Sequence, residues 1–263
     1  MNKISKSFDK NIVLYDADFS LSNCTLILGE NGSGKTTLLR ILSGICKKYA
    51  GFNEVGSEAS LLLDASCLFL FKTGLENLEY FLNKKELEKA YEYIKTLKID
   101  EYINKRVFKY SNGMKKKLGL IISMSRNKKY LLLDEPTNSL DIDSIKLLKE
   151  LLINEKNNRK IVIASHDIKI FDEKLIDSIL VIKNNKLLQK MINQLDYTFF
   201  KVKTLEEINE SIFKYDVENN YYIFKVNNQE IMEFSEYVCK YKVIEMIKID
   251  YFDKRYLEEI YNG

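Results

Sequence analysis

The segment Gly29–Thr36, with the sequence GENGSGKT, constrains the fold more than any other part of the chain. It matches G-x-x-x-x-G-K-[ST], a loop that wraps around phosphate groups between a buried strand and a helix. The apolar run Cys24–Leu28 predicts that strand, and Thr37–Leu42 predicts that helix. A chance glycine-rich turn, the alternative, would not require this order of strand, Lys-Thr pair and helix. We therefore predict a parallel α/β core around a P-loop.

The P-loop residues are the first candidates for a ligand site. Glycines allow several backbone N–H groups to face one anion, and the following helix N-terminus adds a partial positive charge. Lys35 is expected to reach the β- and γ-phosphates of a nucleotide, and the Thr36 hydroxyl is expected to ligate Mg²⁺. The predicted nucleotide-contacting residues here are Gly29, Glu30, Asn31, Gly32, Ser33, Gly34, Lys35, Thr36 and Thr37.

A second apolar run, Tyr130–Leu133, ends in the carboxylates of Asp134 and Glu135. Continuous apolar residues are typical of a parallel strand buried on both faces. Asp134 is placed like the acidic residue that helps to hold Mg²⁺ in P-loop enzymes. Glu135 is placed to accept a proton from an attacking water, as a general base does. Acidic residues are also common at ordinary strand-to-loop junctions, but their position after a P-loop favours the catalytic interpretation.

His166 is the only histidine of the chain, and it follows another apolar run, Lys160–Ser165. The carboxyl ends of parallel strands meet at one edge of a sheet, where ligands bind. We therefore expect His166 near Asp134 and the γ-phosphate. A lone histidine is more often structural, yet this position favours a catalytic role.

Together these motifs resemble the nucleotide-binding domain of ABC transporters over about residues 1–195. Tyr110–Met114 resembles the signature motif of that family, Ser139–Asp141 its D-loop and Ser165–Asp167 its switch-histidine region. Phe8 matches the aromatic residue that stacks on adenine, with Tyr15 as the alternative. The resemblance implies that the ligand is ATP with Mg²⁺. It also implies nucleotide contacts for Phe8, Ser111, Gly113 and Asp141.

The signature motif has a physical interpretation as well. Ser111 offers a hydroxyl and Gly113 a close backbone N–H at the start of a predicted helix, Met114–Ser125, where a phosphate could bind. The resemblance implies that this phosphate belongs to ATP on an opposite subunit, so that two subunits enclose two ATP molecules. The partner would be a second copy or a paralogous ATPase subunit. The alternative is that Ser111 only caps the helix.

The signature motif and the loop around Asp64 depart from the pattern of the family. Asn112 and Met114 replace the usual glycine and glutamine of the signature, a variant that resembles exporter-type members. Asp64 falls where a glutamine is usual. An ionised carboxylate can ligate Mg²⁺ but cannot donate a hydrogen bond. We therefore predict Asp64 as a further metal ligand beside Thr36 and Asp134.

The pattern of the whole chain predicts an α/β fold with two domains. Residues 1–195 are expected to form a P-loop NTPase core with a β-rich N-terminal subdomain (Ile4–Phe19) and a helical insert at about 72–127. Residues 196–263 are expected to form a small C-terminal α/β domain. Further core elements are predicted at strand 131–134, helix Ile142–Glu155, strand 161–165, helix Ile168–Leu175 and a hairpin between Ile179–Ile182 and Leu187–Leu188.

The predicted C-terminal domain carries no catalytic motif, and acidic residues outnumber basic ones from Phe199 to Gly263. It resembles the C-terminal extension of ATPases that serve drug and lantibiotic exporters, in which its role would be dimerisation or regulation. Its predicted elements are strands Thr198–Val202, Tyr221–Val226 and Val243–Ile249, helices Leu205–Phe213 and Gln229–Tyr237, and a closing helix at Arg255–Tyr261.

Composition narrows the choice of partners. With 41 basic and 38 acidic residues among 263, the net charge is +3, which does not indicate nucleic-acid binding. No apolar run approaches the roughly 18 residues of a transmembrane helix, and the N-terminus lacks a signal-peptide pattern. We expect a cytoplasmic protein that lies on the inner face of the membrane through a separate polytopic permease.

The leading hypothesis is the ATP-hydrolysing subunit of an ABC exporter, whose ATP-driven dimer closure is coupled to the permease. The docking surface is expected around Asp64–Asn77, with a contribution from Leu68–Phe71 unless that run is buried. One alternative is a soluble ABC ATPase that acts on ribosomes or DNA without a permease. Another is a module that binds a partner without hydrolysis, although Glu135 and His166 argue against it.

Overall fold

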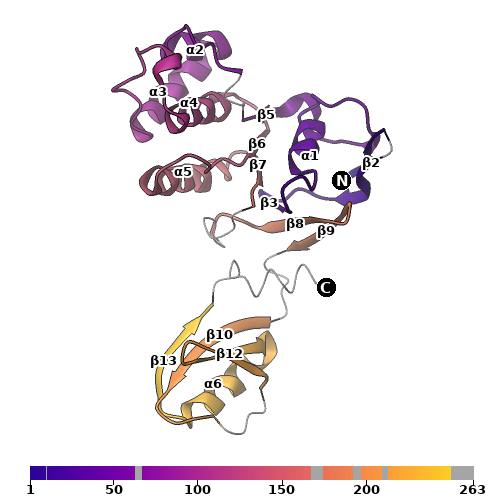
Figure 1. Ribbon diagram of the computed structural model, residues 1–263, viewed down its shortest axis with the longest axis vertical. Helices are drawn as coiled ribbons and strands as arrows, with labels where there is room; N and C mark the ends of the chain where they lie inside the picture. The colour runs from indigo at the N-terminus through magenta and orange to yellow at the C-terminus, as the bar shows by residue number, and fades with distance from the viewer. Residues whose placement is uncertain (10, 63–66, 167–173, 192–196, 209–212, 250–263) are drawn as a thin grey trace. The chain divides into compact units, whose positions relative to one another are not determined.

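The computed structural model describes residues 1–249 apart from residue 10 and segments 63–66, 167–173, 192–196 and 209–212. It divides the chain into two compact units, Met1–Gln189 and Lys190–Gly263 (Figure 1). The predicted domain boundary at residue 195 lies outside the described residues and stays a prediction. The closing helix predicted at Arg255–Tyr261 and most of the helix predicted at Ile168–Leu175 also lie outside them.

A six-stranded sheet forms the centre of the first unit, in the order β5-β6-β7-β3-β8-β9. Its strands are β3 (Cys24–Leu28), β5 (Ala59–Leu61), β6 (Tyr130–Asp134), β7 (Lys160–Ala164), β8 (Ser178–Lys183) and β9 (Lys186–Met191). The strands from β5 to β8 pair in parallel, and every residue of β3 is buried, which matches the continuous apolar runs in the sequence. Asn184 and Asn185, both with positive φ, make the turn of the predicted hairpin.

The strand register brings three strand ends to one edge of this sheet. Ile27 of β3 pairs with Ala164 of β7, and Ala164 pairs with Asp134 of β6. The connections that follow these strands therefore begin side by side. They carry the P-loop, Glu135 and His166, which is the convergence that the sequence predicts.

A small antiparallel sheet covers helix α1 (Lys35–Leu42) in the first unit. Its order is β2-β1-β4, with β1 at Asn2–Phe8, β2 at Asn11–Phe19 and β4 at Ala50–Phe52. Ile4, Leu14 and Phe19 of this sheet are buried in the same hydrophobic cluster as Leu38 and Leu42 of α1. The predicted β-rich start is confirmed, and its core contacts help to hold the P-loop helix in place.

Three helices fill the predicted insert at 72–127, on the opposite side of the central sheet from β2 (Figure 1). They are α2 (Gly74–Phe81), α3 (Lys84–Thr96) and α4 (Asn112–Ser125), with α5 (Ile142–Glu155) beside them. Thr73 and Asn83 each cap a helix through a capping box with the glutamate three residues later. Short 3-10 helices lie at Gly56–Glu58 and Val107–Lys109.

The second unit contains a four-stranded antiparallel sheet in the order β11-β12-β10-β13, with helix α6 on one face. Its elements are β10 (Tyr197–Thr204), β11 (Tyr215–Glu218), β12 (Tyr221–Asn227), a 3-10 helix at Asn228–Glu230, α6 (Ile231–Cys239) and β13 (Val243–Lys248). Phe200, Phe224 and Phe234 form the centre of its core. The three predicted strands are confirmed.

Two predictions for this unit need correction. Residues 205–208, the start of a predicted helix, are not helical, and 209–212 lie outside the described residues. The helix predicted from Gln229 begins at Ile231 instead, because Asn227 caps a 3-10 turn before it.

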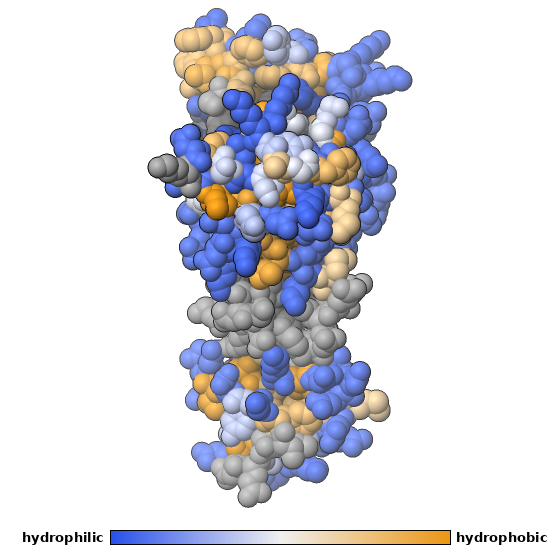
Figure 2. All heavy atoms as spheres, turned by 90° about the vertical axis from the view of Figure 1, so that its right-hand side faces the viewer, coloured by the Kyte–Doolittle hydropathy of each residue, from blue (hydrophilic) through white to orange (hydrophobic). Residues whose placement is uncertain are grey.

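Hydrophilic side chains dominate the face shown in Figure 2, and hydrophobic side chains occur there in small separate groups. In the part of the chain that the structure describes, no helix is long and apolar enough to span a bilayer.

Candidate nucleotide-binding site

The P-loop runs from the end of β3 to the start of α1, as predicted. Gly34 caps α1 in the left-handed conformation, with φ of +108°. A Cβ atom at this position would lie 2.6 Å from Cγ1 of Val13, so strand β2 passes directly against the loop. Only glycine accommodates both the backbone conformation and this contact. Val13 is thus part of the loop's surroundings that the sequence analysis missed.

Lys35 folds back over the P-loop. Its side chain is buried, and Nζ donates hydrogen bonds to the carbonyl oxygens of Gly29 at 2.7 Å and Glu30 at 3.1 Å. Among the described residues no carboxylate forms an ion pair with this ammonium group. A buried cation without a counter-ion, next to a helix N-terminus, fits an anionic ligand such as the phosphates of a nucleotide.

Thr36 and Asp134 contact each other at the N-terminus of α1. The Thr36 hydroxyl donates a hydrogen bond of 2.7 Å to Oδ2 of Asp134, although the two residues lie 98 positions apart. Within the described residues no group of three or more His, Cys, Asp and Glu side chains could hold a metal by itself. One carboxylate and one hydroxyl beside a phosphate site fit Mg²⁺, which commonly takes its remaining ligands from water and substrate phosphates. Asp64, the third predicted metal ligand, lies outside the described residues.

Glu135 and His166 also meet, across neighbouring strand ends. Oε1 of Glu135 lies 2.9 Å from Nδ1 of His166, and the Ser165 hydroxyl donates to Oε2 at 3.4 Å. The backbone N–H of Glu135 donates to the carbonyl of Ala164 at 2.9 Å and fixes the turn, in which Glu135 has a positive φ of 44°. This uncommon conformation for a side-chain-bearing residue aims the carboxylate at the sheet edge. His166 was expected to lie near Asp134. In the structure it contacts Glu135, the residue that follows Asp134.

The signature segment forms the start of α4. Ser111 caps the helix, since its Oγ accepts a hydrogen bond from the Met114 N–H at 3.2 Å. A Cβ on Gly113 would lie 2.6 Å from the carbonyl oxygen of Ser139, so the segment resembling the D-loop packs against this glycine. The capping interpretation of Ser111 is therefore present in the structure. Nucleotide contact by Ser111 and Gly113 stays a prediction. The Ser111 hydroxyl acts as the acceptor in the capping bond, so its own proton can still be donated to a phosphate oxygen.

Asp141 caps helix α5. Its Oδ1 accepts a hydrogen bond of 2.8 Å from the Ser144 N–H, and this bond holds the pKa of the carboxyl below its usual range. Lys117 of α4 approaches the other oxygen at 4.0 Å. Asp141 therefore has a structural role as a helix cap, and its contact with a nucleotide stays a prediction.

The two aromatic candidates for adenine stacking are exposed on the antiparallel sheet. Phe8 at the end of β1 is 51% exposed, and Lys6 Nζ lies 4.1 Å from its ring centroid. Tyr15 on β2 is 61% exposed. Both rings are accessible to a ligand, and the choice of Phe8 remains a prediction.

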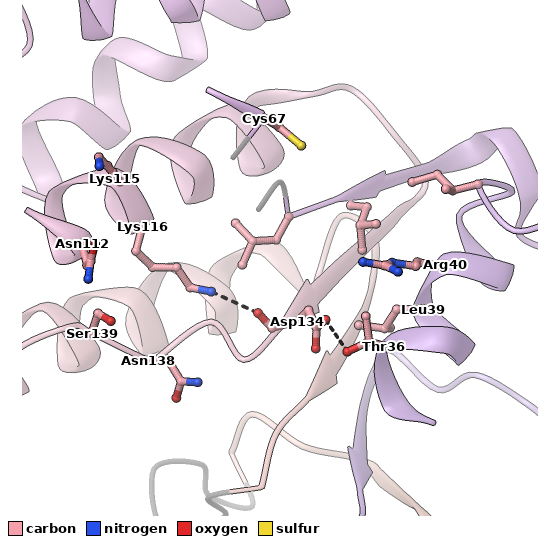
Figure 3. Close-up of a pocket in the computed structure, with 13 residues that line it drawn as sticks. Thr36, Leu39, Arg40, Cys67, Asn112, Lys115, Lys116, Asp134, Asn138 and Ser139 are labelled. Carbon is pink, nitrogen blue, oxygen red and sulfur yellow. Dashed lines mark hydrogen bonds between the residues drawn. The ribbon is translucent and has the colours of Figure 1, made fainter. Parts of the chain in front are cut away.

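A cavity of about 540 Å³ joins the metal-ligand candidates to the signature helix (Figure 3). Thr36 and Asp134 line one side, and Asn112, Lys115 and Lys116 of α4 line another. Lys116 Nζ donates a hydrogen bond of 3.1 Å to the carbonyl oxygen of Asp134, so Asp134 is held by both α1 and α4. The sequence analysis did not predict this contact, because it depends on how α4 packs against the end of β6.

The comparisons with known proteins agree with this geometry. The family model described as ABC transporter matches residues 15–138. An uncharacterised ABC transporter ATP-binding protein of Methanocaldococcus jannaschii is 30% identical over 195 residues, which cover 71% of this chain and 74% of that protein. The chain belongs to the ATP-binding proteins of ABC transporters. It is an ABC ATPase, and its nucleotide is ATP.

Two further relatives of this ABC ATPase are also named as ATP-binding proteins, and one of them is named for import. The aliphatic sulfonates import ATP-binding protein SsuB 1 of Shouchella clausii is 29% identical over 238 residues, covering 85% of this chain and 94% of that protein. The ATP-binding protein NatA of Bacillus subtilis is 31% identical over 183 residues, covering 62% and 74%. The family membership that the motifs predict is confirmed, whereas the direction of transport is not determined, and an import name occurs among the relatives.

Solved structures support the fold class. An ATP-binding subunit of an ABC transporter superposes with a TM-score of 0.65 at 19% identity, covering 73% of this chain and 89% of the other. A dimeric ATP-binding cassette in a post-hydrolysis state with ADP and Pi has a TM-score of 0.59 at 20% identity, covering 74% and 100%. The predicted α/β fold with a P-loop NTPase core is confirmed.

Proposed function

We propose that this ABC ATPase is the energy-coupling subunit of an exporter, working as a dimer with a separate membrane permease. The observation that carries the proposal is the meeting of Lys35, Thr36, Asp134 and Glu135 at one edge of the parallel sheet. These residue types supply a phosphate contact, two metal ligands and a base. Phosphoryl transfer to water requires all of these parts.

Each residue then has a defined task. Lys35 and the P-loop amides neutralise the phosphate oxygens, and Thr36 and Asp134 would hold Mg²⁺, with Asp64 as a further proposed ligand. Bound Mg²⁺ supplies charge stabilisation for the transferring phosphoryl group. Glu135 takes a proton from the attacking water, and His166, 2.9 Å from its carboxylate, orients that carboxylate.

The position of the signature segment supports the proposal of a dimer. Ser111 and Gly113 stand at the N-terminus of α4, a helix whose first turn holds no acidic side chain and is followed by three lysines. Such a helix end attracts an anion. We propose that it receives the ATP of a second copy or of a paralogous subunit, with Asp141 at the same interface.

The permease is proposed to dock on exposed aromatic side chains of the helical insert. Phe71 is 80% exposed, Tyr80 65% and Phe108 46%, and the rings of Phe71 and Phe108 lie 6.1 Å apart. Exposed apolar side chains that gather in this way are typical of protein–protein contacts. This surface includes part of the predicted docking segment around Asp64–Asn77, and it would keep the chain on the inner face of the membrane.

Export rather than import is proposed from the variant signature residues Asn112 and Met114 and from the C-terminal unit. The test is purification of the tagged chain from its native cell in mild detergent, followed by peptide identification. Recovery of a polytopic membrane protein supports the transporter, and the direction of substrate movement in vesicles containing both proteins then decides between export and import. Recovery of ribosomal or DNA-maintenance proteins without a membrane protein would overturn the proposal.

A further inference from the structure

A second cavity, of about 270 Å³, lies at the amino ends of strands β6 and β7. Its lining comes from the first two turns of α3, from the ends of α4 and α5, and from the connections that follow these two helices. The five residues of β6 span about 15 Å between this cavity and Asp134. The cavity therefore lies at the sheet edge opposite the nucleotide-binding site, and it shares no lining residue with the cavity beside Thr36.

Basic side chains dominate the lining of this second cavity. Five are basic and two are acidic, which gives a net charge of +3. In the described part of the chain, Lys85, Arg126 and Lys128 form no ion pair. Like charges around one cavity repel each other, so an anion that binds between them is stabilised. The basic residues are Lys85, Lys89, Arg126, Lys128 and Arg159.

The two acidic side chains of the cavity already have other partners. Glu155 forms ion pairs with Lys89 at 2.8 Å and with Arg159 at 2.5 Å. The carboxylate of Glu86 accepts hydrogen bonds from the backbone N–H groups of Asn83 at 3.0 Å and Asn127 at 2.9 Å. The remaining three cations of the cavity are therefore not neutralised from within it.

Two buried polar atoms of the lining residues have no hydrogen-bond partner within the described residues. They are the Ser125 hydroxyl and Nε of Arg159, and the two residues are only 1% and 8% exposed. The other nitrogens of Arg159 donate to the carbonyl oxygens of Arg126 at 2.9 Å and Met124 at 2.5 Å, which fixes the guanidinium at the end of α4. A buried donor without a partner is costly, and a ligand that accepts hydrogen bonds would remove that cost.

We propose that this cavity binds a small soluble compound that carries a phosphate group. A phosphate monoester has a charge of about −1.5 to −2 at neutral pH, and its oxygens match both guanidinium and ammonium donors. The volume of about 270 Å³ is near the lower limit of small-molecule sites, which favours a small phosphorylated metabolite over a nucleotide. One bound molecule would connect α3 of the helical insert to the segments that lead into β6 and β7.

The first test is calorimetric titration of the full chain with inorganic pyrophosphate, at constant ionic strength and with ADP present to occupy the P-loop. Lys85→Gln and Lys128→Gln should each weaken binding at least about tenfold, because each removes a charge that lines the cavity. Lys84→Gln and Lys129→Gln are the matched controls, since these exposed neighbours do not line it. A dissociation constant above about 1 mM, or equal losses in all four variants, would overturn the proposal.

The second test locates the ligand through thermal unfolding. Pyrophosphate should raise the melting temperature of wild type and of Lys35→Ala equally, because Lys35 belongs to the nucleotide-binding site. Loss of this rise in Lys35→Ala would assign the binding to the P-loop and overturn the proposal. Ser125→Ala should keep the melting temperature of the free protein, since its hydroxyl has no partner, but should show a smaller rise with pyrophosphate. A rise equal to that of wild type would contradict the proposed position of the ligand.

Discussion

The hydroxyl of Thr36 donates a 2.7 Å hydrogen bond to the carboxylate of Asp134, and this bond connects helix α1 to the end of strand β6. The two oxygen atoms lie beside the P-loop amides and Lys35. The 2.7 Å between the Thr36 hydroxyl and the Asp134 carboxylate shows that these two proposed Mg²⁺ ligands lie close together.

Asp134→Asn should keep the bond to Thr36, because an amide oxygen also accepts, but it removes the negative charge that a metal requires. The Mg²⁺-dependent part of ATP affinity should fall at least about tenfold, whereas affinity measured in EDTA should stay unchanged. Calorimetric titration with and without Mg²⁺ measures both values. Asp143→Asn, at an exposed acidic residue on α5, is the control. Equal losses under the two conditions would rule out a metal role.

Glu135→Gln should lower the rate of ATP hydrolysis by about 10²–10⁴-fold, because the amide cannot accept the proton of the attacking water. ATP affinity should change little, and the variant should accumulate as an ATP-bound dimer. Glu150→Gln on the exposed face of α5 serves as the control. Hydrolysis at the wild-type rate would remove Glu135 from the mechanism. His166→Ala should also lose turnover, since the partner of the Glu135 carboxylate is then missing.

Gly113→Ala tests the contact between the signature segment and Ser139. The added Cβ would lie 2.6 Å from the Ser139 carbonyl, so one of the two segments must move. We expect hydrolysis to fall about tenfold or more while ATP affinity of the P-loop is retained. Unchanged hydrolysis together with an unchanged melting temperature would mean that the contact is dispensable.

Glu155 makes stability depend on pH. Burial alone would raise its pKa, but hydrogen bonds from Lys89 and from the Tyr93 hydroxyl, together with the charge of Arg159, hold the pKa below its usual range. Because the folded pKa is lower than the unfolded one, the stabilisation is complete above about pH 4.5 and is lost as pH falls through the folded value.

Glu155→Gln should therefore destabilise the chain by about 3 kcal/mol at pH 7, since two cations lose their partner. The difference from wild type should shrink below about pH 4. Urea unfolding followed by circular dichroism at several pH values measures it. A difference that stays constant with pH would show that the carboxylate charge is not its source.

The sequence predicted the elements that carry strong local signals. Helix α5 begins and ends where expected because Asp141 is a good capping residue and the apolar spacing is regular. Strands β4 and β5 have only three residues each, which is too short for a readable period, and β11 was missed for a similar reason.

The contacts of the candidate site were less predictable than its residues. Motif spacing identified Thr36, Asp134 and Glu135, because their strand and helix contexts are local. The bond from Lys116 to the Asp134 carbonyl depends on how α4 packs against β6. No pattern within one segment indicates that kind of contact.

The position of Asp134 between two helices has a thermodynamic consequence. Its carboxylate is held from α1, and its carbonyl oxygen is held by Lys116 of α4, the helix that starts at Ser111. An ion that draws the carboxylate away from Thr36 changes the Lys116 bond only if the backbone of Asp134 moves with its side chain. In that case the two ligands are linked. If the ion changes the affinity of α4 for its own ligand by some factor, that ligand changes the affinity for the ion by the same factor. In a dimer built as proposed, this carbonyl would connect the ion site of each subunit to its signature helix.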